Sequence, residues 1–195
     1  MTGTIARVGK KYRFIAIEGE GDHLEPLLSI CNLERDPGQT ERVLGANDRP
    51  IPYNTLPWTR YARGTLFDFG GLGLPFTDYV AAITQLAQVT RSRVMCTEEL
   101  STVIYDVIIL VSATGELLRH MVCTEVGEGV SVGAPLFDAE RPRWEEDEFD
   151  YPEYTPALAL EWFLGFSAYD WSDFRLNHAT LSRMIVTPVR RVRGR

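Results

Sequence analysis

The side chains with the most evident chemical potential lie between residues 143 and 154, in the stretch RWEEDEFDYPEY. Five of the six residues from Glu145 to Asp150 are carboxylates, and four aromatic residues lie among or beside them: Trp144, Phe149, Tyr151 and Tyr154. Ionised carboxylates at this density cannot be buried, because each would lose its hydration without a cation to replace it. The stretch is therefore expected at the surface, either as a solvated connector or as a surface that captures a positively charged group.

The capture interpretation follows from the mixture of residue types. Carboxylates give long-range attraction and fast association with a basic partner, and aromatic side chains add rigid apolar anchors. The mixture predicts a partner-binding surface of eight consecutive residues: Trp144, Glu145, Glu146, Asp147, Glu148, Phe149, Asp150 and Tyr151. A cationic cleft, such as the active site of a nuclease or of another enzyme that binds phosphates, would suit this surface. In the alternative, the aromatic residues of a solvated connector fold back onto the core.

A glycine-rich stretch, FGGLGLPF at residues 69–76, follows an expected strand and precedes an expected helix. Backbone amides in such a loop can bind phosphate, but the dinucleotide-binding pattern is incomplete because Gly71 and Gly73 are not followed by a third glycine. The apolar residues of the loop also suit a tight turn that allows close packing of helix and sheet. We therefore predict no nucleotide and no other cofactor.

Residues able to act as nucleophiles, bases or metal ligands are scattered along the chain. Nucleophilic catalysis requires a base within hydrogen-bond reach of a serine or cysteine, yet His120 is expected to face Ile109, and Cys123 points to the opposite face of the same strand. The motifs GxSxG, HExxH and the calcium-binding loop do not occur, so we assign no catalytic residue and no metal ligand. The adjacent Glu98 and Glu99 are expected at the turn before a hairpin, pointing in different directions. The sequence predicts a protein that is not an enzyme.

The elements that position these residues centre on a β-hairpin over residues 102–126. Two apolar, β-branched runs, TVIYDVIILV and ELLRHMVCTEV, flank the connection SATGE, and Thr114 and Gly115 as a two-residue loop predict a tight hairpin. The loop sets the register: Val111 opposite Leu118, Ile109 opposite His120, Val107 opposite Val122, and Asp106 opposite Cys123. Both faces are rich in aliphatic residues, so we expect this hairpin to be central and covered on both sides.

Periodicity elsewhere predicts further strands and helices. A first strand, ending at Gly19–Gly21, has Phe14 and Ala16 on one face and Ile15 and Ile17 on the other. Helical spacing predicts helices near 24–31 and 79–90, and residues 35–60 read as a long irregular connection rich in Pro, Gly, Asn and Asp. A helix from residue 155 is apolar almost all round and is expected to be buried. A short helix is expected at 172–184, and an edge strand or an extended segment at 184–189.

These elements predict an α+β fold with a central antiparallel or mixed β-sheet and packed helices. We expect a single domain over residues 1–189 and a basic, flexible tail at 190–195. The chain has 195 residues, of which 45% are hydrophobic and 24% charged, as is typical of soluble globular domains. Three cysteines without a paired spacing indicate reduced thiols (Cys31, Cys96, Cys123), and no apolar run has the length of a membrane span. We expect a cytoplasmic protein that does not bind a membrane.

The net charge is −7, and without the four arginines of residues 190–195 the rest of the chain carries −11. So acidic a body repels nucleic acid and attracts basic partners. The sequence thus favours a neutraliser that occludes a basic enzyme, of the type represented by bacterial immunity proteins and antitoxins, with a toxin enzyme as the partner. Two alternatives stay open: an enzyme or small-ligand binder with a pocket between the sheet and the helix at 155–168, and an assembly subunit of a phage or secretion apparatus.

Overall fold

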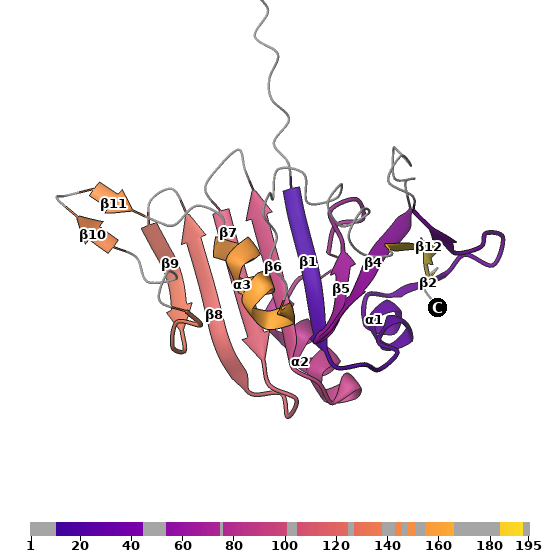
Figure 1. Cartoon of the computed structure of the whole chain (residues 1–195), viewed down its shortest axis with the longest axis horizontal. Helices are drawn as coiled ribbons and strands as arrows, with labels where there is room; N and C mark the ends of the chain where they lie inside the picture. The colour runs from indigo at the N-terminus through magenta and orange to yellow at the C-terminus, as the bar shows by residue number, and fades with distance from the viewer. Residues whose placement is uncertain are drawn as a thin grey trace, which may run out of the picture.

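A ten-stranded antiparallel sheet forms the body of the protein (Figure 1). The computed structural model describes residues 11–44, 54–74, 76–100, 105–124, 127–137, 143–145, 148–150, 155–165 and 184–192. The strands of the main sheet are β1 (Lys11–Glu18), β2 (Leu33–Arg35), β3 (Arg42–Val43), β4 (Thr55–Tyr61), β5 (Gly64–Asp68), β6 (Val94–Leu100), β7 (Tyr105–Val111), β8 (Leu117–Thr124), β9 (Gly127–Val132) and β12 (Ile185–Arg191). The described helices are α1 (Leu24–Ile30), α2 (Tyr79–Thr90) and α3 (Thr155–Leu164).

The strands follow the order β2-β12-β4-β5-β1-β6-β7-β8-β9 across the sheet, and β3 also pairs with β12. All pairings in the sheet are antiparallel. Helices α2 and α3 both pack on the central strands β6 and β7, from opposite sides. The α+β class with one central sheet, as predicted from the sequence, is confirmed.

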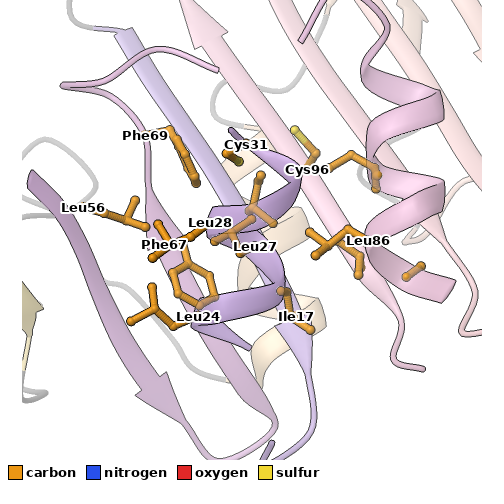
Figure 2. Close-up of a cluster of buried hydrophobic side chains, with 14 of the residues drawn as sticks. Ile17, Leu24, Leu27, Leu28, Cys31, Leu56, Phe67, Phe69, Leu86 and Cys96 are labelled. Atoms are coloured by element: carbon orange, nitrogen blue, oxygen red, sulfur yellow. The ribbon is translucent and has the colours of Figure 1, made fainter. Parts of the chain in front are cut away.

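The sheet separates two hydrophobic clusters, and β1 contributes to both. Ile15 and Ile17 belong to the cluster beneath α1 and α2, and we call this side the α2 face of the sheet. Phe14 and Ala16 belong to the cluster beneath α3, on the side we call the α3 face. The predicted alternation of these four residues is confirmed. Figure 2 shows how side chains of α1 and α2 meet those of the strands in the first cluster: Ile17, Leu24, Leu27, Leu28, Cys31, Leu56, Phe67, Phe69, Leu86 and Cys96.

The two helices on the α2 face lie where helical spacing places them. In α1 the apolar residues Leu24, Leu27 and Leu28 are buried, and Pro26 falls in the first turn, where its missing N–H has no intrahelical partner to lose. Helix α2 begins after Asp78, whose carboxylate accepts a hydrogen bond from the Ala81 amide at 3.0 Å. Such a cap satisfies one of the amides left open at a helix start.

Helix α3 is buried on one side only, so the expectation of burial all round was wrong. Ala159, Leu160, Phe163 and Leu164 are buried against the sheet, whereas Trp162 remains 40% exposed. A helix lying on one face of a sheet covers only the stripe that meets the strands. The helix therefore carries an apolar side chain, Trp162, outside the stripe that the sheet covers.

The predicted hairpin is present as β7 and β8, and most of its register is confirmed. Asp106 pairs with Cys123, Val107 with Val122 and Ile109 with His120, but Val111 pairs with Leu117 instead of Leu118. The Ser112 amide donates to the Glu116 carbonyl, so the loop holds the three residues between them. Gly115, the last of the three, has a φ of +92°. A three-residue loop shifts the register by one, and a bulge at the start of β8 restores it.

Two proline-containing strands depart from the predictions. The expected irregular connection at 35–60 contains β3 and most of β4, and the expected edge strand β12 has strand neighbours on both sides. Pairing of β4 with β5 begins at Trp58, just after Pro57, and β12 leaves β4 and joins β2 at Pro188. Pro188 therefore falls where the ladder with β4 ends, whereas Pro57 lies opposite Val186 within the β4–β12 ladder and one residue before the ladder with β5 begins.

The last strand also reaches into the predicted tail. Arg190 and Arg191 pair with residues of β2, and Arg190 Nε lies 2.7 Å from Glu34 Oε1. The tail boundary expected at residue 189 is therefore wrong for these two residues. The helix expected at 172–184 lies outside the described residues, apart from Met184. No helix within the described ranges has the length and apolar character needed to cross a membrane.

Candidate functional site

The acidic and aromatic residues chosen from the sequence form a small hairpin of their own. Strands β10 (Arg143–Glu145) and β11 (Glu148–Asp150) pair antiparallel, with Trp144 opposite Phe149 and Glu145 opposite Glu148. They make up a separate two-stranded sheet. Figure 1 shows this acidic hairpin outside the outline of the main sheet, on the side of β9. Of the eight predicted binding residues, three lie outside the described residues: Glu146, Asp147 and Tyr151.

The register of the acidic hairpin is unfavourable in electrostatic terms. Like charges at directly opposite positions destabilise an antiparallel pair, and Glu145 and Glu148 occupy such positions. An isolated two-stranded hairpin is also only marginally stable in water. The charges at these two positions therefore oppose formation of the hairpin. A cation bound between the two positions would offset this effect.

The glycine-rich loop that follows β5 folds onto itself. The amides of Leu72 and Gly73 both donate to the Phe69 carbonyl, at 3.1 and 2.8 Å, and the Gly70 amide donates to Asp68 Oδ1 at 2.7 Å. These amides are therefore engaged within the turn. The apolar residues of the loop pack against the cluster on the α2 face (Leu72, Leu74 and Phe76).

The adjacent Glu98 and Glu99 lie within β6, so their expected place at a turn was wrong. Glu98 belongs to the α2 face, where its Oε1 lies 2.6 Å from both Nε and Nη2 of Arg13. Tyr79 at the start of α2 also hydrogen-bonds to Glu98, and burial together with that negative charge raises the pKa of Tyr79 to about 12. This carboxylate has its cation and a hydrogen-bond donor, which makes it a structural ion pair.

Glu99 belongs to the opposite face, where it meets a second carboxylate. It lies directly opposite Asp106 in the pairing of β6 with β7. Asp106 is 7% exposed, and burial, followed by the neighbouring charge of Glu99, raises the pKa of Asp106 to about 7. Burial also raises the pKa of Glu99. No hydrogen bond or cation within the described part of the chain contributes to either shift.

Thr97 lies next to this pair, on the same face of β6. It is 1% exposed, and its hydroxyl oxygen makes no hydrogen bond. Buried hydroxyl groups are nearly always hydrogen-bonded in proteins, so each exception needs an explanation such as a bound ion, a ligand or a catalytic role. Two neighbouring carboxylates and one hydroxyl without a hydrogen bond thus lie together on the α3 face. We call these three residues the carboxylate site.

The sequence contained one signal of this site. Asp106 interrupts the apolar run VIYDVIILV, and its pairing with Cys123 was predicted correctly. The second carboxylate was missed because Glu99 was assigned to a turn, where it would have been solvated. Only the pairing of β6 with β7 brings the two side chains together.

The histidine and cysteines considered from the sequence form no catalytic group. His120 faces Ile109 as predicted, and its pKa is lowered by burial and then by Arg119. All three cysteines are buried and take part in no disulfide, and burial raises the pKa of Cys31 to about 12. Among the described residues, no three His, Cys, Asp or Glu side chains cluster as metal ligands.

Comparison with known proteins gives no further assignment. No protein-family model matches this chain, and no match was found among curated proteins or among solved structures.

Proposed function

We propose that this protein binds and neutralises a basic partner enzyme, in the manner of immunity proteins and antitoxins. The observation that carries the proposal is the acidic hairpin, a strongly acidic and aromatic segment that forms a sheet separate from the core. Carboxylates of this segment would pair with Lys or Arg side chains at the partner's substrate site: Glu145, Glu146, Asp147, Glu148 and Asp150. Trp144, Phe149 and Tyr151 would serve as apolar anchors.

The charge of the whole chain supports the same proposal. The net charge of −7 would accelerate encounter with a cationic surface, and the hairpin would set the orientation in which the two proteins meet. The repulsion between Glu145 and Glu148 would be relieved when a partner's cation binds between them. Occlusion of a cationic active site would require no catalytic residue in this protein.

The test compares two variants that remove the same number of charges. The hairpin variant Glu145→Ser/Glu148→Ser and the control Glu20→Ser/Glu116→Ser each raise the net charge by two, and the control residues are exposed on other turns. The partner is first isolated by pull-down with the tagged wild-type chain and identified by mass spectrometry. Association rates of that partner are then measured at low and high salt.

We expect the hairpin variant to associate at least about tenfold more slowly at low salt, with a smaller difference at high salt, where surface charges are screened. The control variant should lose much less. The free energy of unfolding of both variants should stay within about 0.5 kcal/mol of wild type, because substitutions away from the core contribute little and the hairpin forms a sheet separate from the main one. Equal association rates for the hairpin variant and wild type would remove the hairpin from the mechanism.

A second candidate function is a small-ligand binder or enzyme with its site between the sheet and α3. The carboxylate site favours this function, because it lies on the α3 face and holds a buried hydroxyl without a hydrogen bond beside two neighbouring carboxylates. Perturbed carboxylates at such a place are frequent in binding and catalytic sites.

A further inference from the structure

The carboxylate site has three acceptor groups on one face of the sheet. Thr97 and Glu99 are two residues apart on β6, so their side chains lie on the same side of the strand, and Asp106 lies opposite Glu99 on β7. Directly opposite residues have Cβ atoms about 4.5–5.5 Å apart, and diagonal neighbours such as Thr97 and Asp106 are about 7–8 Å apart. The three side chains can therefore reach one small group between them.

This arrangement is costly if nothing binds to it. Asp106 and Thr97 are almost fully buried, whereas Glu99 is only partly so. A buried hydroxyl without a hydrogen bond and two neighbouring carboxylates both destabilise the folded state. Because Glu99 is partly exposed, a ligand would reach the site from the side of Glu99. A bound cation with hydrogen-bond donors would offset both costs at once.

The chemistry of the acceptors selects among cations. Ca²⁺ takes about six to eight oxygen ligands and Mg²⁺ keeps several of its waters, and no three potential metal-binding side chains cluster in the described part of the chain. A primary ammonium has three N–H donors, no acceptor and a single positive charge. It matches two carboxylates and one hydroxyl, group for group.

We propose that Thr97, Glu99 and Asp106 bind a primary ammonium group on the α3 face of the sheet. The ammonium would belong to a small aliphatic amine or to a lysine side chain of a protein. Thr97 would accept one hydrogen bond, and each carboxylate would accept another with its charge. The inference rests on the second candidate function and does not depend on the acidic hairpin.

The experiment follows the carbon-13 signal of the Asp106 carboxyl group by NMR while n-butylammonium is added to the full-length protein. Tetramethylammonium serves as a probe with the same charge but no N–H donor, and Mg²⁺ serves as a hard cation. A lysine-containing tripeptide shows whether the site admits an ammonium attached to a peptide. The variants are Asp106→Asn and Thr97→Val, and Glu116→Gln is the control for loss of a distant carboxylate.

We expect butylammonium to shift the Asp106 signal in a saturable way, and tetramethylammonium to have no such effect. Asp106→Asn and Thr97→Val should each weaken butylammonium binding, the former by about tenfold because a charge-assisted bond is lost. Both variants should nevertheless be at least as stable as wild type without ligand. Asp106→Asn removes a buried carboxyl group opposite a second carboxylate, and Thr97→Val removes a buried hydroxyl without a hydrogen bond. A merely structural role would not lower affinity while leaving stability intact.

The other outcomes overturn the proposal in different ways. Equal effects of butylammonium and tetramethylammonium would mean that the site senses charge without hydrogen bonding. Binding of Mg²⁺ without binding of ammonium would identify a hard-cation site and leave the second candidate function standing. No response to any probe would overturn both. None of these results bears on the acidic hairpin, which is tested with a different partner and different variants.

Discussion

Asp106 is a carboxyl residue that the fold buries next to a second carboxyl group. It belongs to the central strand β7, and its neighbours along the strand on the α3 face, Ile108 and Leu110, are fully buried. Burial disfavours the charged carboxylate, and the opposite Glu99 disfavours it further. The protein therefore holds a proton there at pH values at which an exposed aspartate would have lost it.

The raised pKa of Asp106 predicts a pH-dependent effect of Asp106→Asn. The pKa of Asp106 in the folded protein, about 7, lies above its ordinary value of 3.8. The contribution of protonated Asp106 to the free energy of unfolding is thus fully present below the ordinary pKa. The wild-type protein loses this contribution as the pH rises toward 7. Asparagine has no such loss, so the variant should gain stability relative to wild type as the pH increases. The difference is bounded by about 4 kcal/mol, since one pKa unit corresponds to about 1.4 kcal/mol.

Urea unfolding of both proteins at about pH 5 and about pH 8 measures this difference. The Asn variant should be favoured more at the higher pH. Glu116→Gln, on the exposed turn between β7 and β8, provides the comparison with an ordinary carboxylate. A stability difference between Asp106→Asn and wild type that does not change with pH would contradict the raised pKa.

The three residues of the carboxylate site show how far sequence reasoning extends at this scale. The pairing of Asp106 with Cys123 was predictable, because side chains alternate along β-strands and the loop of a hairpin fixes the register of its two strands. The pairing of Asp106 with Glu99 was not predictable, because Glu99 lies in β6 and the adjacent Glu98 and Glu99 had indicated a turn at that place. Thr97 gave no signal, since an unpaired hydroxyl differs from a satisfied one only in three dimensions.

At the scale of elements, Gly133 shows how closely the end of β9 approaches β8. Its φ is +84°, and a Cβ atom placed there would lie 2.0 Å from the Leu118 carbonyl oxygen. That oxygen belongs to the backbone and cannot rotate away. The neighbouring Arg119 also fixes this end of the sheet, because its Nη1 donates to the Val132 carbonyl and to Ser131 Oγ, both at 3.0 Å.

We predict that Gly133→Ala lowers the free energy of unfolding by at least about 1–3 kcal/mol, through the strained φ and the displacement of β9. Gly71→Ala is the matched control, since a Cβ atom there would meet nothing within 4 Å. The control should be neutral or stabilising by up to about 1 kcal/mol, because alanine reduces the freedom of the unfolded chain. Chemical denaturation of the two variants measures both effects. Equal free energies of unfolding for Gly133→Ala and Gly71→Ala would contradict the close approach of β9 to β8.

The elements predicted best were those with a strong local pattern. β1, α1, α2 and the β7–β8 hairpin have clear periodicity or turn residues, and the sequence placed all of these elements correctly. β4 and β12 were misjudged because Pro57 and Pro188 argue against central strands. Pro188 ends the ladder between β12 and β4, and Pro57 lies one residue before the ladder between β4 and β5 begins. Both positions depend on residues far away in the chain.

At the scale of the whole molecule, the two hydrophobic clusters share the same strands. β1, β6 and β7 each contribute residues to both clusters, so neither can be lost without exposing the back of the other. We predict one cooperative thermal transition, with a calorimetric enthalpy equal to the van't Hoff enthalpy. At about 0.7 kcal/mol per residue, the enthalpy near 60 °C should be about 140 kcal/mol. Differential scanning calorimetry measures it, and two separate transitions would divide the chain into independently folding parts.

The position of β12 has a consequence for how the protein acquires its structure. Ile185 pairs with Trp58 and Arg191 pairs with Leu33, so these contacts join segments separated by more than a hundred residues. Closing so long a loop is entropically costly and slows folding. Before β12 inserts, β4 lacks the neighbour with which it pairs at Thr55 and Leu56, and β2 and β3 lack the strand that holds them to the sheet. A newly made chain would thus present unpaired strand edges to other chains, so β12 is the strand whose arrival protects the protein from aggregation.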